Sequence, residues 1–363
     1  MISVGLVGTS WWSDSMFLAS LQDHPQGRIT AICGRNRQRA QEVADKWKIE
    51  KVYTDYEAMI EGGEIQALIV STPNNSHYPM TMKALEAGLH VICEKPLALN
   101  YGEAKRMADL ADQKGVKHFV PFTWRFTPPA CYIKELIEGG YIGKPYHLNL
   151  RWQSNFRQSS DYQWRYDKRL SGTGILGDLG SHFIYLASWY FGNISSVSCQ
   201  LGYLRERAPL DLDGKPYEVA DDVALLLLQF ENGALGSLHL SGVAEEPTSP
   251  QWMEFHGSDG TLHSAIDFGK LQQVTGKRAG DEAIAELPIP DHIWQGASRE
   301  NILATFGDLQ HKPDFMTRRF ITAIAEDKPI KPDFHDGASV QRVLDAALKS
   351  HEERRWIDVD SIN

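Results

Sequence analysis

The chain has 363 residues, 42% of them hydrophobic and 23% charged, with a formal net charge of -10. This length favours two domains, and the negative charge argues against nucleic-acid or anionic-membrane partners, which select basic surfaces. No apolar run approaches the roughly 20 residues of a membrane helix. The N-terminus leads straight into an apolar strand, without the basic region and cleavage site of an export signal. We therefore expect a cytoplasmic protein with no membrane partner.

The four cysteines are far apart in the sequence and form no pair at metal-ligand spacing. They are Cys33, Cys93, Cys131 and Cys199. We expect free thiols in a reducing compartment and no metal site.

In the first third of the chain, apolar segments that predict strands alternate with helical patterns. The predicted strands cover residues 2–8, 28–33, 67–71, 91–93 and 116–121. The predicted helices cover residues 15–22, 38–48, 55–61, 77–87 and 100–113. This alternation indicates an α/β fold with a doubly wound parallel sheet, which we assign to residues 1–124.

The loop after the first strand lies where a dinucleotide-binding fingerprint is expected. At the glycine positions of G-x-G-x-x-G the chain has Gly8, Ser10 and Ser13, so only the tight turn keeps its glycine. Alone, this motif is equally compatible with an ordinary turn between a strand and a helix. The alternating domain that it opens favours a dinucleotide, whose phosphates would lie at the helix N-terminus. The residues expected to contact it are Gly8, Thr9, Ser10, Trp11 and Trp12.

The end of the second strand bears on the choice between NAD(H) and NADP(H). Domains that select NAD usually place a carboxylate there to bind the ribose 2′-hydroxyl, whereas this chain has Gly34. Arg35 and Arg37 follow, and guanidinium groups match a 2′-phosphate in charge and geometry. We expect Gly34 and Arg35-Asn36-Arg37 to contact the cofactor and NADP(H) to be preferred. The alternative is that both arginines are a solvated helix start.

Two more strand ends carry polar residues to the same sheet edge. The strand at 67–71 leads into Ser71-Thr72-Pro73-Asn74 and His77, which we expect to line the dinucleotide. The strand at 91–93 leads into Glu94-Lys95-Pro96, with Glu94 expected near the nicotinamide ribose. A lone lysine at a strand end is commonly a solvated charge. These surroundings favour a functional Lys95 instead.

After residue 126 the alternation stops and β-patterned segments predominate. A helix near 129–138 is followed by predicted strands at 146–156, 197–204, 223–230, 234–241, 252–256 and 260–264. Asn232-Gly233 predicts a hairpin turn, and helices near 313–326 and 336–353 close the chain. We expect residues 125–363 to form an α+β domain with a large, mostly antiparallel sheet.

A glycine-rich segment at 171–182 carries a carboxylate and an imidazole. Asp178 and His182 are four residues apart, and we expect them on one face of one helix. A carboxylate beside an imidazole orients it and raises its pKa, which suits general acid–base catalysis. The alternatives are a helix-start aspartate with an incidental histidine, or half of a metal site. The second is less supported, because no further His or Cys stands nearby at ligand spacing.

Four features in combination resemble the glucose–fructose oxidoreductase/inositol dehydrogenase (Gfo/Idh/MocA) family. They are the fingerprint-bearing first strand, Ser71-Thr72-Pro73-Asn74 followed by His77, Glu94-Lys95-Pro96, and Gly177-Asp178-Leu179-Gly180-Ser181-His182. The resemblance continues through Trp164-Arg165 and 257–261 to the last helix. Ser10 and Ser13 depart from the family pattern at the phosphate loop, and Gly34 departs from it at the ribose site.

The resemblance implies an N-terminal Rossmann domain that binds a nicotinamide cofactor. It also implies a C-terminal sheet used for substrate binding and for contacts in a homo-oligomer, either a dimer or a tetramer. Lys95, Asp178 and His182 would form the catalytic set.

Hydride transfer between an alcohol carbon and a nicotinamide needs a group that takes the hydroxyl proton or returns it. Imidazole, with an ordinary pKa of about 6.5, suits this at neutral pH, whereas a lysine needs a lowered pKa or acts as a fixed cation. We assign His182 as the acid–base and Lys95 as hydrogen-bond donor to the oxygen, with a proton relay through Lys95 left open. Asp178 is assigned as the orienting residue and as acceptor of a substrate hydroxyl. The division between Lys95 and His182 stays open.

Aromatic and hydrogen-bonding side chains in the second half suit a polyhydroxylated ring. They are Trp124, Arg125, Asn155, Tyr162, Trp164 and Arg165, together with Asp178 and His182. We expect an NAD(P)-dependent oxidoreductase acting on CH–OH groups of a sugar, sugar derivative or cyclitol. Some of these aromatic residues could instead belong to the core. Two other functions stay open, a non-catalytic dinucleotide-binding sensor or scaffold and an imine-type reductase.

Overall fold

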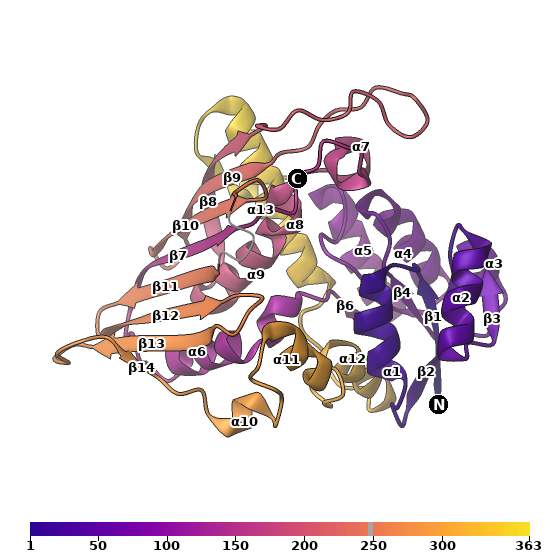
Figure 1. Cartoon of the computed structure of the whole chain (residues 1–363), viewed down its shortest axis with the longest axis horizontal. Coiled ribbons are helices and arrows are strands. Elements are labelled where there is room, and N and C mark those ends of the chain that lie inside the picture. The colour runs from indigo at the N-terminus through magenta and orange to yellow at the C-terminus, as the bar shows by residue number, and fades with distance from the viewer. Residues whose placement is uncertain (246–249) are drawn as a thin grey trace. The chain divides into compact units, whose positions relative to one another are not determined.

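A computed structural model describes residues 1–245 and 250–363, and within it the chain packs as two compact units (Figure 1). The first comprises Met1–Pro121 and Leu309–Gln341, and the second comprises Phe122–Asp308 and Arg342–Asn363. We expected the chain to divide once, between residues 124 and 125. In the structure Leu309–Gln341 returns to the first unit, which a single division does not include. An amphipathic pattern does not reveal on which of two cores a helix packs.

The first unit is built on a six-stranded sheet in the order β3-β2-β1-β4-β5-β6, with every pair parallel. Its strands are β1 (Ile2–Val7), β2 (Gly27–Cys33), β3 (Lys51–Tyr53), β4 (Ala67–Val70), β5 (His90–Cys93) and β6 (His118–Phe119). The predicted doubly wound parallel sheet is confirmed. Strand β3 was not predicted, because its three residues give no apolar pattern. The strand order reverses between β1 and β4, where open sheets of this kind bind ligands.

Helices alternate with these strands. They are α1 (Ala19–Leu21), preceded by a π-helical segment (Ser13–Leu18), α2 (Arg37–Trp47), α3 (Tyr56–Glu61), α4 (His77–Glu86), α5 (Tyr101–Lys114) and α12 (Met316–Ala325). Asn36 begins α2 by accepting a hydrogen bond from the Arg39 amide (3.0 Å), and Asn100 begins α5 by accepting one from the Glu103 amide (2.9 Å). These caps fix where each helix starts beyond its strand.

Helix α12 is joined to the first unit by a buried arginine. Arg318 is 8% exposed, and its Nη1 donates to the Ser20 carbonyl (2.9 Å) and the Asp23 carboxylate (2.6 Å). Ile321 also packs against Gly27, where an added Cβ would lie 2.7 Å from Ile321 Cγ2. The pairing of α12 with the region of α1 explains why Leu309–Gln341 packs here.

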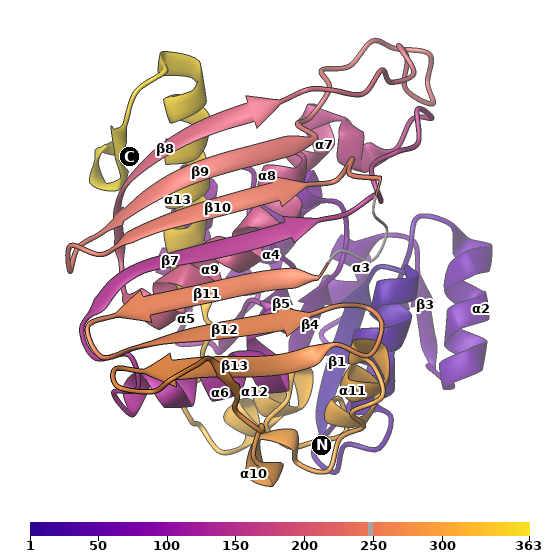
Figure 2. The same ribbon diagram turned by 60° about the vertical axis from the view of Figure 1, so that its left-hand side comes forward.

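The second unit contains a nine-stranded sheet in the order β14-β13-β12-β11-β7-β10-β9-β8-β15 (Figure 2). Its strands are β7 (Pro145–Gln153), β8 (Ile194–Gly202), β9 (Val223–Phe230), β10 (Leu235–Ser241), β11 (Gln251–Gly257), β12 (Gly260–Ile266), β13 (Gln272–Arg278), β14 (Ala285–Glu286) and β15 (Ile357–Asp358). Strands β7 and β10 pair in parallel, and the other pairs are antiparallel. The predicted mostly antiparallel sheet is confirmed.

The hairpin between β9 and β10 forms where Asn232-Gly233 predicts it. Gly233 has a φ of 86°, and the Asn232 side chain accepts a hydrogen bond from the Ala234 amide (2.9 Å). The two strands then pair from Gln229–Leu235 to Val223–Ser241. Strands β13 to β15 were not predicted, because β13 is polar at most positions and the other two have two residues each.

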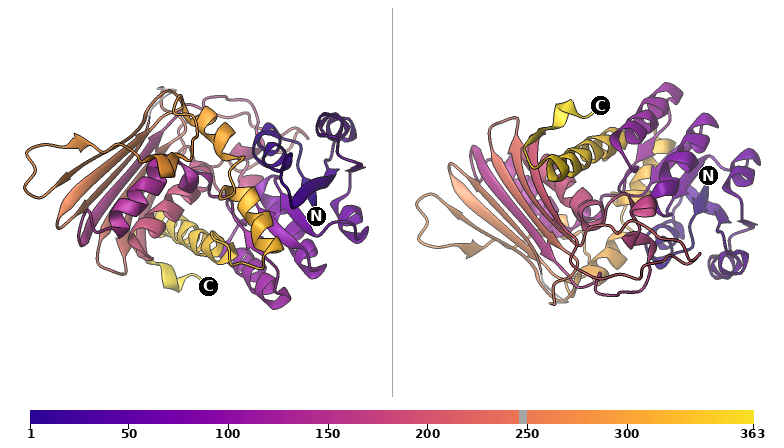
Figure 3. Two further views of the ribbon diagram at one scale, coloured as in Figure 1. Left: turned by 90° about the horizontal axis from the view of Figure 1, so that it is seen from below. Right: turned by 90° about the horizontal axis from the view of Figure 1, so that it is seen from above.

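Helices α6 (Pro128–Glu138), α8 (Ile175–Asp178) and α9 (Gly180–Phe191) of the second unit pack on this sheet. The unit also contains α7 (Lys168–Ser171), α10 (Asp291–Trp294), α11 (Ile302–Leu309) and the end of α13 (Phe334–Glu353). Figure 3 shows the sheet from its edges, with the magenta α6 against one face. Along β9 the residues alternate between buried and exposed, so Leu225 and Leu227 lie on the other face at 43% and 53% exposure. Across the described ranges, no helix is long and apolar enough to span a membrane.

Candidate functional site

The turn after β1 is held against the end of β4. Gly8 has a φ of 129°, and a Cβ at this position would lie 2.1 Å from the Ser71 carbonyl oxygen. Both facts require glycine. The first fingerprint position must therefore be glycine, because the main chain at residue 8 passes close to the main chain at Ser71.

The serines at the other two fingerprint positions form a hydrogen-bonded chain. The Ser13 amide donates to Ser10 Oγ (3.2 Å), and the Oγ atoms of Ser10 and Ser13 lie 3.0 Å apart. Ser13 is fully buried and donates to Ser71 Oγ (3.0 Å). In the usual fingerprint the third glycine permits close packing of helix on strand. Here the same contact is made through hydroxyl groups.

The end of β2 leaves no room for a carboxylate at position 34. A Cβ on Gly34 would lie 2.7 Å from Thr9 Cγ2 and 3.3 Å from Ala40 Cβ. The next three residues are exposed, and Asn36 uses its side-chain oxygen to cap α2. The guanidinium groups of Arg35 and Arg37 thus stand at the strand end where the sequence predicts the 2′ site.

His77 contacts two of the loops at this edge, the one after β4 and the one after β5. It is fully buried, with Nδ1 2.9 Å from the Pro96 carbonyl oxygen and Nε2 3.0 Å from the Thr72 carbonyl oxygen. Burial lowers the pKa of the imidazole, so the neutral form is favoured. His77 was expected to line the dinucleotide. In the structure both nitrogens of its ring contact the main chain of these loops.

Glu94 and Lys95 follow β5 directly. Glu94 is 7% exposed, and its Oε1 accepts a hydrogen bond from Trp12 Nε1 (2.6 Å). Its Oε2 accepts one from the Lys95 amide (3.1 Å). Lys95 is half-buried, and the Lys95–Pro96 peptide bond is cis. Residues from the ends of β1, β4 and β5 therefore meet at the point where the strand order reverses.

The second unit places the glycine-rich segment in two consecutive helices. Asp178 is the last residue of α8, and His182 lies in the first turn of α9, with Leu179 between them. The expectation of a single unbroken helix is wrong, although Leu179 between the two helices keeps right-handed helical angles (φ -93°, ψ -38°). Gly177 and Gly180 favour a short helix with a break, because glycine costs about 1 kcal/mol in a helix interior.

One residue from a distant segment caps the start of α8. Asp221 Oδ1 accepts from the Gly174 amide (2.6 Å), Oδ2 accepts from the Leu176 amide (2.8 Å), and its carbonyl accepts from the Ile175 amide (3.0 Å). A Cβ on Gly174 would lie 1.9 Å from the Asp221 carbonyl oxygen. Burial raises the pKa of Asp221. This cap determines where α8 starts and hence where Asp178 lies.

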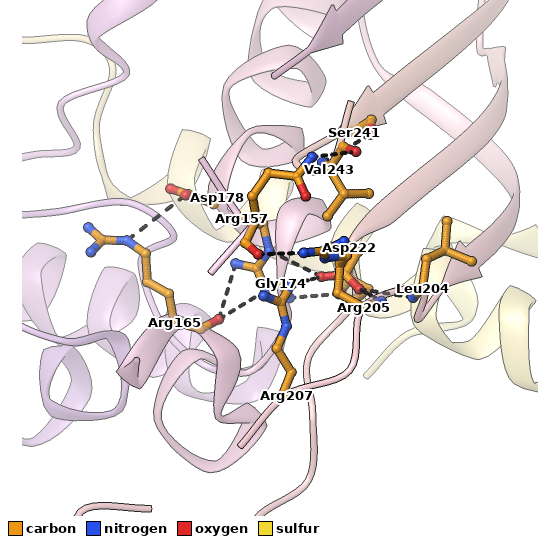
Figure 4. Close-up of polar contacts among 12 residues, drawn as sticks. Arg157, Arg165, Gly174, Asp178, Leu204, Arg205, Arg207, Asp222, Ser241 and Val243 are labelled. Atoms are coloured by element: carbon orange, nitrogen blue, oxygen red, sulfur yellow. Dashed lines mark hydrogen bonds and ion pairs between the residues drawn. The ribbon is translucent and has the colours of Figure 1, made fainter. Parts of the chain in front are cut away.

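Arg165 and a buried charge cluster stand beside Asp178 (Figure 4). Arg165 Nε lies 4.0 Å from Asp178 Oδ2. The Arg165 carbonyl accepts hydrogen bonds from Nη1 and Nη2 of the buried Arg157 (3.2 and 3.3 Å). Arg157 and Arg207 both pair with the fully buried Asp222 and lie over the Tyr166 ring. These four residues were not predicted, and the Asp221-Asp222 pair before β9 was the signal that could have indicated them.

His182 is 6% exposed and lies on an aromatic wall. Its ring is edge-on to Phe122 at 6.2 Å between centroids, and Phe122 stacks on Tyr185 at 4.3 Å. Arg125 donates to the Tyr185 hydroxyl and lies 4.8 Å over the Trp189 ring. Arg125 therefore supports this wall.

The other predicted substrate residues divide into two groups. The Arg165 guanidinium, which lies beside Asp178, is 4.4 Å over the Trp164 ring. Trp124 packs edge-on against Trp152 (5.1 Å) and Phe306 (5.8 Å), in an aromatic cluster. Tyr162 donates to Asp167 (3.2 Å), and the Asn155 carbonyl accepts from the Gln158 amide (3.2 Å).

In the described ranges, no three His, Cys, Asp or Glu residues gather as metal ligands would.

Comparison with known proteins identifies the family. A model described as "Oxidoreductase family, NAD-binding Rossmann fold" matches residues 2–122, and one described as "Oxidoreductase family, C-terminal alpha/beta domain" matches residues 134–359. The chain belongs to the Gfo/Idh/MocA oxidoreductase family.

Relatives with assigned activities match over most of their length. Levoglucosan dehydrogenase of Pseudarthrobacter phenanthrenivorans is 29% identical, covering 92% of this chain and 90% of the relative. The scyllo-inositol 2-dehydrogenase (NADP(+)) of Bacillus subtilis is 27% identical, covering 98% and 95%. A solved structure of levoglucosan dehydrogenase with NADH and levoglucosan superposes with a TM-score of 0.86 at 27% identity, covering 99% of both chains.

The Gly174 contact generates a stability prediction. Gly174→Ala places a Cβ against the Asp221 carbonyl, so we expect the free energy of unfolding to fall by about 2 kcal/mol or more. Gly307 is a matched control, because it lies within α11 and a Cβ there meets nothing within 4 Å. Gly307→Ala should be neutral or stabilise the protein by about 0.5–1 kcal/mol. Urea denaturation of both variants measures the difference, and equal stabilities would contradict the role assigned to the Asp221 cap.

Proposed function

We propose that this chain is an NAD(P)-dependent dehydrogenase that transfers a hydride between the nicotinamide and a secondary alcohol or ketone of a sugar, sugar derivative or cyclitol. The main observation in support is the anchored Glu94-Lys95 turn at the reversal of strand order in a family oxidoreductase. The names of relatives that act on levoglucosan and on scyllo-inositol support the substrate class.

The residues at this edge fit a dinucleotide. The turn at Gly8, the start of the helical segment near Ser13 and the exposed guanidinium groups at the end of β2 follow the arrangement that binds phosphates and ribose. We assign the loops at Gly8–Trp12, 34–37 and Ser71–Asn74 to cofactor binding. A bound nicotinamide supplies the hydride acceptor.

We assign the handling of the proton to Lys95 and His182. Lys95 donates a hydrogen bond to the reacting oxygen, and His182 takes the hydroxyl proton or returns it. Asp178 orients this set, and Arg165 and Trp164 contribute hydrogen bonds and an apolar ring face for a polyhydroxylated substrate. Such side chains favour sugars and cyclitols over apolar ketones.

Turnover with sugars, sugar lactones and inositols, followed by absorbance of the reduced cofactor with NAD(+) and with NADP(+), tests this function. Oxidation of at least one polyol with saturation kinetics is the expected result. Binding of a dinucleotide without turnover of any polyol would favour a sensor, and reduction of cyclic imines alone would favour an imine reductase.

Substitution of Lys95 tests its role in turnover. Lys95→Met removes the donor to the reacting oxygen, so we expect kcat to fall by about 100-fold with little change in dinucleotide affinity. Lys105 pairs with Asp109 on the exposed side of α5, and Lys105→Met serves as the control. Steady-state kinetics and fluorescence titration measure the two quantities. Equal losses in turnover and cofactor affinity would make Lys95 a binding residue.

The cofactor preference can be tested at the end of β2. We propose that NADP(H) is used with kcat/KM about tenfold or more above NAD(H), because Arg35 and Arg37 bind the 2′-phosphate. The double substitution Arg35→Ala/Arg37→Ala should abolish the preference while leaving kcat/KM for NAD(H) nearly unchanged. Arg39 pairs with Glu42 on the same helix, and Arg39→Ala is the control. Equal kcat/KM for both cofactors in the unaltered protein would show that the 2′ site has been misplaced.

The exposed face of the second sheet is proposed as the contact of a homo-oligomer. Leu225 and Leu227 on β9 and Leu235 on β10 are 43%, 53% and 55% exposed on regular strands. Contiguous apolar residues on a monomer surface mark interfaces. Leu227→Glu should lower the molar mass measured by light scattering, whereas Leu212→Glu, on a loop where Leu212 is 88% exposed, should not. An unchanged mass in Leu227→Glu would place the interface elsewhere.

A further inference from the structure

The Glu94 side chain joins two loops of the first unit. Its carboxylate lies between the loop after β1, which supplies Trp12, and the turn after β5, which carries Lys95. Oε1 accepts from the Trp12 indole N–H at 2.6 Å, and Oε2 accepts from the Lys95 amide at 3.1 Å. Each carboxylate oxygen thus has a different donor. Because Glu94 is 7% exposed, water contributes little to holding it.

Two donors on separate oxygens fix the rotation of a carboxylate. A hydrogen bond to a charged acceptor is stronger than one between neutral groups, and a buried charge that loses a donor bears a desolvation cost. Without the indole N–H, Glu94 would favour a rotated position in which it recovers hydrogen bonds. The Lys95 amide would then lose its partner.

The main chain at Lys95 depends on this contact because the sheet ladder has ended. Strand β5 ends at Cys93, and the Glu94 amide donates to the Val70 carbonyl at 3.0 Å. Beyond it, the Lys95 amide is bonded to Glu94 Oε2, and the Pro96 carbonyl is in contact with His77 Nδ1 at 2.9 Å. The side chains of Glu94 and His77 therefore hold the main chain at Lys95 and at Pro96.

We propose that Trp12 is a positioning residue for Lys95. It acts through Glu94, whose carboxylate transmits the position of the β1 loop to the Lys95 amide. This inference rests on the proposed function for the part that Lys95 plays in turnover. It adds a role for Trp12 beyond the contact with the dinucleotide that the sequence predicts. A ring that only touched the cofactor would affect cofactor affinity, whereas a positioning residue affects the reaction step.

The test compares two substitutions that remove the same kind of bond. Trp12→Phe keeps an aromatic ring and removes the N–H that holds Glu94. Trp47 also donates its indole N–H to a carboxylate, Asp14 Oδ1 at 2.5 Å, at the end of α2. Trp47→Phe is therefore the matched control. We expect Trp12→Phe to lower kcat about tenfold with less than a twofold change in KM for the dinucleotide, and Trp47→Phe to change neither.

A double-mutant cycle with Glu94→Gln tests the route of the effect. If Trp12 acts through the Glu94 carboxylate, then Trp12→Phe should cause little further loss of kcat in the Glu94→Gln background. Independent, multiplying losses would overturn the proposal. A raised KM for the dinucleotide with unchanged kcat would also overturn it, because Trp12 would then be a cofactor contact.

Amide hydrogen exchange at Lys95 gives a readout that needs neither substrate nor cofactor. The Lys95 N–H is bonded to Glu94 Oε2, so its exchange should be at least about tenfold faster in Trp12→Phe and unchanged in Trp47→Phe. Unchanged exchange at Lys95 in Trp12→Phe would overturn the positioning role. If the unaltered protein oxidised no polyol, the proposed function would fail, while the exchange measurement would still decide whether Trp12 holds the Lys95 main chain.

Discussion

The close passage of the Gly8 turn over the Ser71 carbonyl is the constraint on which the first unit's site depends. A Cβ at Gly8 would lie 2.1 Å from that oxygen, so the loops after β1 and β4 can approach only with glycine here. Their approach brings Ser13 Oγ within 3.0 Å of Ser71 Oγ. It also places Trp12 where its indole reaches Glu94 after β5. One glycine thus allows three strand ends to be bonded to one another.

In the second unit, different groups hold the segment that carries Asp178. Helix α8 has only four residues, too few to be stable alone, because helix nucleation is costly. Asp221 accepts hydrogen bonds from the N–H groups of Gly174, Ile175 and Leu176 at its start, and the adjacent Asp222 compensates the buried charge of Arg207 and Arg157. Removing one member of a buried charge cluster costs far more than the whole cluster contributes. The cluster therefore serves mainly to specify the local geometry around Asp178 and Arg165.

The two sheets could be predicted from the sequence, and candidate catalytic residues could be named. The side chains that hold these segments in position could not. Apolar strands such as Ala67–Val70 and the Asn232-Gly233 hairpin have short-range patterns, and both are found as predicted. The departures at Ser10 and Ser13 could not be interpreted, because their partner Ser71 is 58 residues from Ser13. The single helix expected across Asp178 and His182 failed because periodicity does not register a break at Leu179.

The same limitation explains why the supporting residues escaped notice. Asp221 lies 47 residues from Gly174, and Trp12 lies 82 residues from Glu94, so no local pattern connects them. In both cases a carboxylate accepts a main-chain hydrogen bond close to a residue of the proposed catalytic set. Asp221 accepts at the helix start before Asp178, and Glu94 accepts from the Lys95 amide itself. A carboxylate accepts at two oxygens and can hold two donors in fixed directions. In each unit, therefore, a carboxylate fixes the main chain beside a residue of the proposed catalytic set.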